Sequence, residues 1–313
     1  MSSRPTPSRC ITLLAGIAFL LGVACVTRAP ASDVAEIVLQ GGWGSQPEQL
    51  GLTMPAPGML PEVPFQGPGG FRVDAQGGVW ISDSVNRAVK VFREGKVEIF
   101  PIPATGLGDL DLCGEAFYVC TRSPDGIFVG RQDDGGEIRR IALACRSPGR
   151  LQVVDENRIL LADGDGGLWW IRNGEPGRHP AEVMEPVGTA EHVFGIVYDL
   201  DESSRSIVRS GWTEQESEPG MFALLKFPKE RIAFSRLLGL QDGNPWVMMV
   251  MASNPGQYRV FRLDGDGKVV REARLPVLTG AWLPAWWVAG PCPVVYGFRS
   301  DPQGFSILRQ SLD

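Results

Sequence analysis

Short polar segments of this 313-residue sequence bring carboxylate, amide and guanidinium groups close together, where they could bind a ligand. Side chains of opposite charge that meet in a hollow suit a small polar or charged ligand. The same residue types also close their own turns through side-chain to backbone hydrogen bonds, and this structural alternative is favoured for each one. The segments are "DSVNR" (83–87), "RSPDG" (122–126), "DGDGG" (163–167) and "RSDPQG" (299–304). The binding candidates in them are Asp83, Asn86, Arg87, Arg122, Asp125, Asp163, Asp165, Arg299 and Asp301.

A glutamate and a histidine form a second kind of candidate. Glu191 and His192 lie at the start of the apolar segment "HVFGIV", which is expected to be the inner strand of a sheet. The sequence has two histidines, His179 and His192, too few for a zinc site built from several histidines. It has no G-x-S-x-G, H-E-x-x-H or phosphate-loop motif. The pair is therefore expected to hydrogen-bond a ligand rather than to catalyse a reaction.

Tryptophans near the end of the sequence are a third candidate site. Trp282, Trp286 and Trp287 lie within six residues of one another, and Trp282 and Trp286 share strand parity, so they face the same side. They could form an aromatic wall for a sugar ring or another apolar ligand. Packing between neighbouring sheets is the alternative that is favoured.

Metal binding has weak support. "DGDGG" (163–167) and "DGDG" (264–267) superficially resemble calcium loops, but neither has the further oxygen ligands or the distal glutamate of an EF-hand. The second is expected in an outer hairpin, where Asp-Gly favours the turn. We therefore predict no cofactor, with a divalent metal such as Ca²⁺ at Asp163 and Asp165 as a minor alternative.

The elements that position these residues recur along the chain. Residues 71–100, "FRVDAQGGVWISDSVNRAVKVFREGKVEIF", read as four short strands separated by turns. Similar units begin near residues 69, 109, 149, 192, 238 and 281, and the fourth has an expanded middle loop, "GWTEQESEPG" (211–220). A four-stranded repeat of about 40 residues is typical of a β-propeller. The sequence therefore predicts an all-β fold, with residues 32–313 forming a single six-bladed propeller.

The ends of this repeat array complete each other. The sixth unit supplies three strands before the chain ends, whereas residues 33–40, "DVAEIVLQ", form a strand-like segment outside every unit. We predict that this segment is the outer strand of the last blade, which would remove an exposed sheet edge. Ligands are expected on the face formed by the middle loops of the blades.

The first unit resembles an NHL-repeat propeller. The resemblance is best over residues 71–92, decays in later units, and implies a fold rather than a function. In such blades the Asp–Asn–Arg set is mainly structural. A gluconolactonase-type metal-dependent hydrolase is the alternative with the same number of blades, and its channel metal would need Glu191, with Asn86 and Asp163 as companions. The NHL positions are filled by Val73, Asp74, Gly77, Asp83, Ser84, Asn86 and Arg87.

The first 31 residues have the layout of an export signal. Arg4 and Arg9 precede an uncharged apolar segment, residues 11–24, that is too short to span a bilayer. "APA" (29–31) offers the small residues that signal peptidase recognises, whereas "GVAC", ending at Cys25, resembles a lipoprotein signal. We expect a periplasmic or extracellular protein, with an outer-membrane lipoprotein anchored at Cys25 as the alternative.

The net charge limits the class of partner, and the cysteine count limits the number of disulfides. Removing three arginines with the signal changes the net charge from −6 to −9, which disfavours nucleic acid as a partner. Cys113, Cys120, Cys145 and Cys292 allow one or two disulfides, and buried thiols with at most one bridge are favoured. The sequence predicts a monomeric, exported, non-catalytic binding or scaffolding propeller for a protein or a small ligand, with the metal-dependent hydrolase as the alternative.

Overall fold

The computed structural model describes most of the chain from residue 35 onward. The described residues form strands β1–β24, and no helix that could span a membrane occurs among them. The strands form six sheets, each of four antiparallel strands. The described ranges are 35–54, 66–123, 125–131, 137–143, 148–163, 167–178, 184–197, 201–212, 219–278, 286–290 and 293–312.

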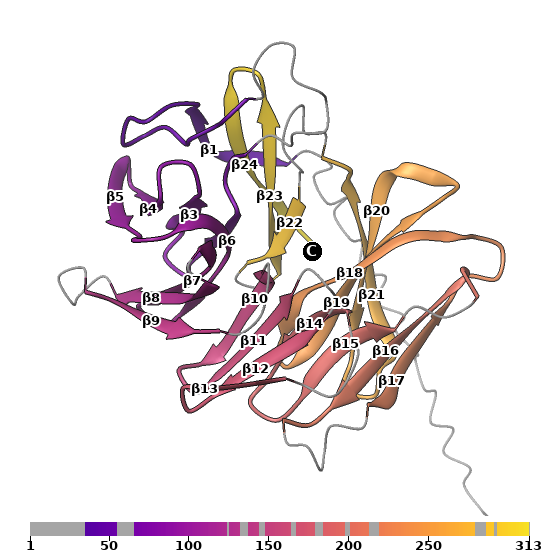
Figure 1. Ribbon diagram of the computed structural model, residues 1–313. Coiled ribbons are helices and arrows are strands. Elements are labelled where there is room, and N and C mark those ends of the chain that lie inside the picture. Colours follow the sequence, from indigo (N-terminus) through magenta and orange to yellow (C-terminus); the bar gives the residue numbers. More distant parts are fainter. Residues whose placement is uncertain are drawn as a thin grey trace, which may run out of the picture. The chain divides into compact units, whose positions relative to one another are not determined.

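Six blades follow the order of the chain around a ring (Figure 1). Blade 1 consists of β2 (Gly70–Val73), β3 (Val79–Asp83), β4 (Ala88–Arg93) and β5 (Lys96–Pro101). Blade 2 consists of β6 (Thr105–Cys113), β7 (Ala116–Ser123), β8 (Asp125–Arg131) and β9 (Ile138–Ala142). Blade 3 consists of β10 (Pro148–Asp155), β11 (Arg158–Asp163), β12 (Leu168–Arg172) and β13 (Glu175–Arg178).

The second half of the ring has the same pattern. Blade 4 consists of β14 (Met184–Gly188), β15 (Val193–Val197), β16 (Ser204–Ser210) and β17 (Gly220–Lys226). Blade 5 consists of β18 (Ile232–Gln241), β19 (Asn244–Met251), β20 (Asn254–Leu263) and β21 (Val269–Pro276). Blade 6 consists of β22 (Trp286–Ala289), β23 (Val294–Asp301), β24 (Gly304–Ser311) and β1 (Glu36–Gly42).

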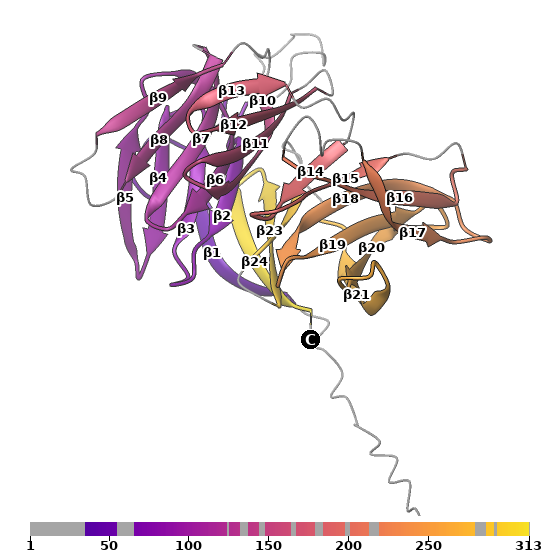
Figure 2. The same cartoon turned by 90° about the horizontal axis from the view of Figure 1, so that it is seen from below.

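The strand β1 closes the ring, as predicted. It pairs antiparallel with β24, from Glu36 opposite Arg309 to Gly42 opposite Gly304, and the two strands lie side by side in Figure 2. The last blade therefore takes its outer strand from the start of the described chain. The edge of β24 is covered, and the six-bladed prediction is confirmed.

Apolar side chains fill the junctions between blades. The six buried clusters each join two consecutive blades, including blade 6 to blade 1. Side chains of a strand alternate between its two faces, so neighbouring residues join different clusters. Trp287 packs between blades 5 and 6, whereas Trp286 packs against the cluster shared by blades 6 and 1. The two adjacent tryptophans of β22 therefore lie on opposite faces of blade 6.

The strand order predicted for blade 4 is wrong by one strand. The first strand is β14, whose sequence "MEPVG" contains a proline and a charged residue, whereas the more apolar "HVFGIV" supplies the second strand, β15. The fourth unit was expected to extend to about residue 237, but Ile232–Gln241 form β18, the first strand of blade 5. Residues 211–219 therefore join β16 to β17 rather than forming the middle loop.

Candidate functional site

A cavity of about 740 Å³ lies among the first strands of the blades. Its lining includes residues of β2, β6, β10, β14, β18 and β22, together with the turns at 74–76 and 114–115 and with Gly290. These turns join first to second strands. Successive turns of an antiparallel sheet lie at opposite ends, so this cavity opens on the face opposite the middle loops. We call it the main cavity.

The main cavity has two unlike walls. Blades 1 to 3 supply its charged and amide side chains, whereas blades 4 to 6 supply small or apolar residues. A ligand with one polar side and one apolar side would match both walls. The polar wall includes Arg72, Asp74, Gln76, Arg93, Asp111, Glu115, Arg150 and Gln152. The apolar wall includes Val187, Leu238, Gly239, Ala289 and Gly290.

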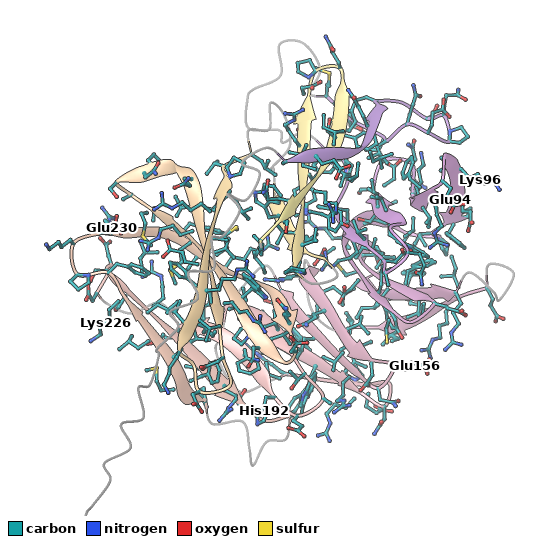
Figure 3. All side chains as sticks on the ribbon, turned by 180° about the vertical axis from the view of Figure 1, so that it is seen from behind. Glu94, Lys96, Glu156, His192, Lys226 and Glu230 are labelled. Carbon is teal, nitrogen blue, oxygen red and sulfur yellow. The ribbon has the colours of Figure 1, made fainter. Side chains whose placement is uncertain are left out.

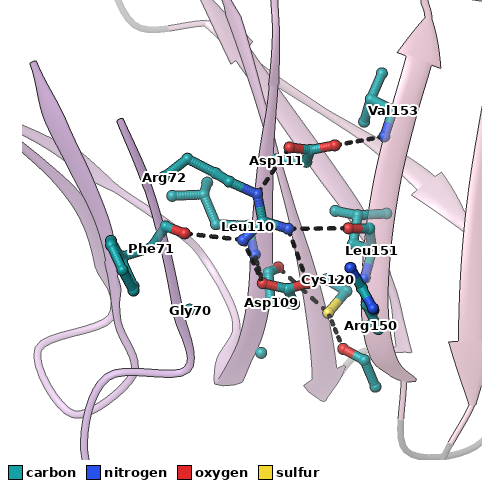
Figure 4. Close-up of polar contacts among 12 residues, drawn as sticks. Gly70, Phe71, Arg72, Asp109, Leu110, Asp111, Cys120, Arg150, Leu151 and Val153 are labelled. Carbon is teal, nitrogen blue, oxygen red and sulfur yellow. Dashed lines mark hydrogen bonds and ion pairs between the residues drawn. The ribbon is translucent and has the colours of Figure 1, made fainter. Parts of the chain in front are cut away.

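A buried ionic network organises the polar wall (Figure 4). The Arg72 guanidinium on β2 donates from Nε to Asp111 Oδ1 at 2.9 Å and from Nη2 to Asp109 Oδ2 at 3.1 Å, both on β6. It also donates to the backbone carbonyls of Phe71 and Leu151. The two aspartates accept from the backbone N–H groups of Leu151 and Val153 on β10, at 3.0 and 2.6 Å. The network therefore joins the first strands of three blades.

Burial changes the proton affinities in this network. It raises the pKa of Asp111, and the positive charge of Arg72 offsets only part of that effect. Burial also opposes the charged form of Arg72, but the attraction of Asp109 and Asp111 outweighs it and raises the pKa of Arg72. The guanidinium stays charged, and Asp111 takes up a proton at a higher pH than an ordinary aspartate.

Asp74 fixes the turn at the rim of the main cavity. Its carboxylate accepts from the backbone N–H of Gly78 at 2.8 Å and from Trp80 Nε1 at 2.7 Å, and it pairs with Arg93. Burial by itself raises the pKa of Asp74, but these contacts together lower the pKa below its ordinary value. The NHL-type position at Asp74 is therefore occupied by a turn-forming carboxylate.

We expect the stability that Asp74 contributes to depend on pH. Because its pKa is lower in the folded state, the contribution is complete above the unfolded value of about 3.9 and is lost as the pH falls through the folded value. Asp74→Asn should lower the free energy of unfolding by about 1–3 kcal/mol at pH 7. Urea unfolding of both proteins from pH 7 to pH 3 should show this difference shrinking below pH 4, and a constant difference would contradict the assignment.

A second cavity, of about 300 Å³, opens at the start of the first strands. We call it the second mouth, and it lies towards the middle-loop face on which the sequence predicted binding. Arg150 of β10 lines both this mouth and the main cavity, and its Nη2 donates to the carbonyl of Leu238 at 3.3 Å. The mouth is lined by Pro68, Gly69, Asp109, Gly149, Arg150, Arg236 and Trp286.

Two of the predicted binding residues, Asp83 and Asn86, make hydrogen bonds within the chain. Asp83 is fully buried, accepts from Asn86 Nδ2 at 2.7 Å and pairs with Lys90 Nζ at 3.1 Å. Asp83 also accepts from the backbone N–H of Gly51, and Lys90 donates to the carbonyls of Gln46 and Gln49. Residues 43–52, which we call the latch, are thereby tied to blade 1. These contacts are of the kind that the structural alternative for Asp83 and Asn86 predicts.

Most of the other predicted residues that the structure describes line neither cavity. Arg87 and Arg122 are exposed, and Asp163 accepts from Gly167 N–H and from Trp169 Nε1. The Arg299 side chain is half-buried on β23. Trp286 does line the second mouth, with its ring stacked on Phe298 at a centroid distance of 4.8 Å. Asp165 and Trp282 lie outside the described residues.

Glu191 and His192 do not begin an inner strand, contrary to the prediction. They belong to the turn between β14 and β15, where the Glu191 side chain is 84% exposed, and Figure 3 shows His192 at the edge of the molecule. Asn86 and Asp163 lie at middle loops, which are at the other end of the blades from the turn that carries Glu191. The three proposed ligands of a lactonase-type metal therefore do not converge. Within the described ranges, no group of three acidic, histidine or cysteine side chains is placed to hold a metal ion.

Two cysteines can be placed. Cys113 is a free thiol whose pKa is raised by burial, and Cys120 is a buried thiol whose Sγ donates to the carbonyls of Asp109 and Gly149. Neither forms a disulfide in the structure, and Cys145 and Cys292 lie outside the described residues.

Sequence analysis missed most of the residues that line the channel. Asp109 and Asp111 on β6, and Arg150 and Gln152 on β10, alternate with buried apolar residues. This alternation places the polar side chains of each strand on one face and the apolar side chains on the other, and the polar ones line the cavities. Polar residues two apart in the first strands of the second and third repeats were therefore the signal that could have identified the site.

Comparisons with known proteins support the fold. No protein-family model and no curated protein sequence matches the chain. The PQQ-bound form of an aldose sugar dehydrogenase from Streptomyces coelicolor is similar over 91% of this chain and 99% of its own, with a TM-score of 0.53 and 12% identity. A putative oxidoreductase (glucose dehydrogenase) from Thermus thermophilus is similar over 88% of this chain and 99% of its own, with a TM-score of 0.51 and 13% identity. At identities this low, the similarity shows a shared propeller fold alone.

Proposed function

We propose that this chain is an exported, non-catalytic binding propeller that holds a small polar ligand in its main cavity. The observation that carries the proposal is the cavity itself, with its charged wall on blades 1 to 3 and its apolar wall on blades 4 to 6. Its volume of about 740 Å³ lies within the range typical of small-molecule sites. Charged groups on a rigid wall orient a ligand, while an apolar wall favours its burial.

The chemistry of the lining favours binding over catalysis. The lining residues that the structure describes include no histidine, cysteine, serine, threonine or tyrosine, the usual nucleophiles and proton carriers. The carboxylates of Asp74 and Asp111 are held by Arg93 and Arg72, so their lone pairs are committed to structure. The third lining carboxylate, Glu115, is exposed in the turn between β6 and β7. The other polar side chains of the wall are guanidinium and amide groups, which suit recognition better than proton transfer.

Native mass spectrometry and elemental analysis of the protein purified from its own source test this proposal. We expect a bound small molecule that is released on denaturation, and no stoichiometric divalent metal. A stoichiometric metal, or a protein that takes up no small molecule from an extract of its source, would contradict the proposal.

Enlarging the apolar wall should block the main cavity. Ala289→Leu adds three carbon atoms beside Gly239. The space between the two residues is already filled, because a Cβ added to Gly239 would lie 2.7 Å from Ala289 Cβ. The larger side chain must therefore extend into the cavity. We expect affinity for the co-purified molecule to fall by about tenfold or more, because overpacking a closed site costs about 1–3 kcal/mol. Calorimetric titration measures the change.

The matched control is Ala190→Leu, at an exposed turn position outside both cavities. It should leave affinity unchanged. Equal affinity in Ala289→Leu and the unmodified protein would place the ligand elsewhere, provided that circular dichroism shows both variants to be folded.

A further inference from the structure

We propose that the second mouth binds the carboxylate of a ring-bearing organic acid. This inference rests on the proposed function, because it specifies the ligand of the same channel. The site combines the guanidinium groups of Arg150 and Arg236 with the ring of Trp286, three side chains that line one cavity from blades 3, 5 and 6.

The two arginines are brought together across the channel. Arg150 lies on β10 and Arg236 on β18, and both side chains are half-buried. The hydrogen bond from Arg150 to the carbonyl of Leu238 holds the guanidinium of blade 3 against the strand that carries Arg236. Guanidinium groups present fixed pairs of N–H donors that match the two oxygens of a carboxylate.

The carboxylate of Asp109, which lines the same mouth, already accepts hydrogen bonds from Arg72 and from the backbone. Arg72 donates to its two oxygens at 3.1 and 3.2 Å and the backbone N–H of Leu151 donates at 3.0 Å. Arg72 also pairs with Asp111, so three guanidinium groups, those of Arg72, Arg150 and Arg236, meet two carboxylates here. In a chain with a net charge of −6, this excess of guanidinium over carboxylate groups among the named residues favours an anion at this position.

The tryptophan supplies an apolar surface for the rest of the ligand. Stacking on Phe298, with an interplanar angle of 19°, and contact with Phe71 fix the Trp286 ring at the wall. A ring placed against an indole gains contact area and an orientation preference. The cavity volume of about 300 Å³ leaves room for a single ring and its acid group. This combination favours an aromatic acid or a sugar acid over an inorganic anion.

Calorimetric titration of the full-length protein with matched ligands tests the inference. The probes are benzoate and galacturonate, with benzamide and galactose as their uncharged counterparts. We expect at least one acid to bind and its uncharged counterpart to bind with an affinity at least about tenfold lower. Added NaCl should lower the affinity for the acid. Arg150→Gln, Arg236→Gln and Trp286→Leu should each weaken acid binding by about tenfold.

Arg231→Gln is the control, because Arg231 is an exposed arginine next to the start of β18 that pairs with Glu202 at the surface. It should leave acid binding unchanged. Arg150→Lys and Arg236→Lys keep the charge and should recover part of the affinity, which separates loss of binding from loss of folding. Failure of both acids to bind, or binding that the arginine variants do not change, would overturn the inference.

The two proposals fail in different ways. If neither acid binds but a co-purified molecule is still lost in Ala289→Leu, the second mouth is not a carboxylate site and the channel remains a binding site. If neither acid binds and no molecule is lost in Ala289→Leu, both proposals fall.

Discussion

Asp83→Ala should lower the free energy of unfolding by about 3–5 kcal/mol, the range observed when one partner of a buried ion pair is removed. The side chains of Asp83 and Lys90 are 0% and 2% exposed, so the variant would leave the Lys90 ammonium buried opposite no carboxylate. It would also remove the acceptor for the backbone N–H of Gly51 and for the Asn86 amide. Chemical denaturation measures the loss, with circular dichroism as the probe.

The double replacement separates charge from packing. Asp83→Leu combined with Lys90→Met removes both charges and should cost less than Asp83→Ala alone, because no uncompensated ion remains. A loss below about 1 kcal/mol for Asp83→Ala would show that the pair behaves like an exposed one and would contradict its burial. Lys268→Met, which removes an exposed pair with Asp266, is the matched surface control.

Removing β1 should have an effect at least as large. A chain that begins at residue 43 keeps the latch but leaves the edge of β24 unpaired over the positions from Gly304 to Arg309. We expect a loss on the order of 4 kcal/mol in the free energy of unfolding, because a strand and its contacts with the cluster between blades 6 and 1 disappear together. The exposed edge should also promote self-association.

Light scattering after size-exclusion chromatography detects that self-association, and a chain that begins at residue 32 is the reference. Glu36→Gln removes only the surface pair between Glu36 and Arg309 and should change stability by less than about 1 kcal/mol. A shortened chain that is monomeric and equally stable would mean that β1 does not close the ring.

The blade number and the closing strand could be predicted because they depend on local patterns. Turn residues such as those of "AQGG" and "EGK" recur between strand-like segments, and the spacing alone implies six blades. Blade 4 was misassigned because β14 contains Pro186 and β15 is more apolar. How apolar a strand segment is reflects the burial of its two faces rather than the distance of the strand from the propeller axis.

The site was harder to predict, since facing the axis is a property of the assembled ring. Asp83 and Asn86 were conspicuous because they are polar and follow a strand, yet their hydrogen bonds join the latch to blade 1. Arg150 and Arg236 lie within strands and come together only when blades 3 and 5 face each other across the channel. A single sequence carries no sign of that juxtaposition. Trp286 both lines the second mouth and packs against the cluster between blades 6 and 1.

The pairing of β1 with β24 also determines the order in which the protein can fold. Glu36 and Arg309, which are joined across these strands, lie 273 residues apart in the chain. Contacts between such distant residues carry a loop-closure cost and form late. During synthesis, blades 1 to 5 can form in turn while β1 has no partner, because β24 has not yet emerged. Until then the newly made chain is an open arc whose first strand is available to other proteins, and closure commits it to the ring.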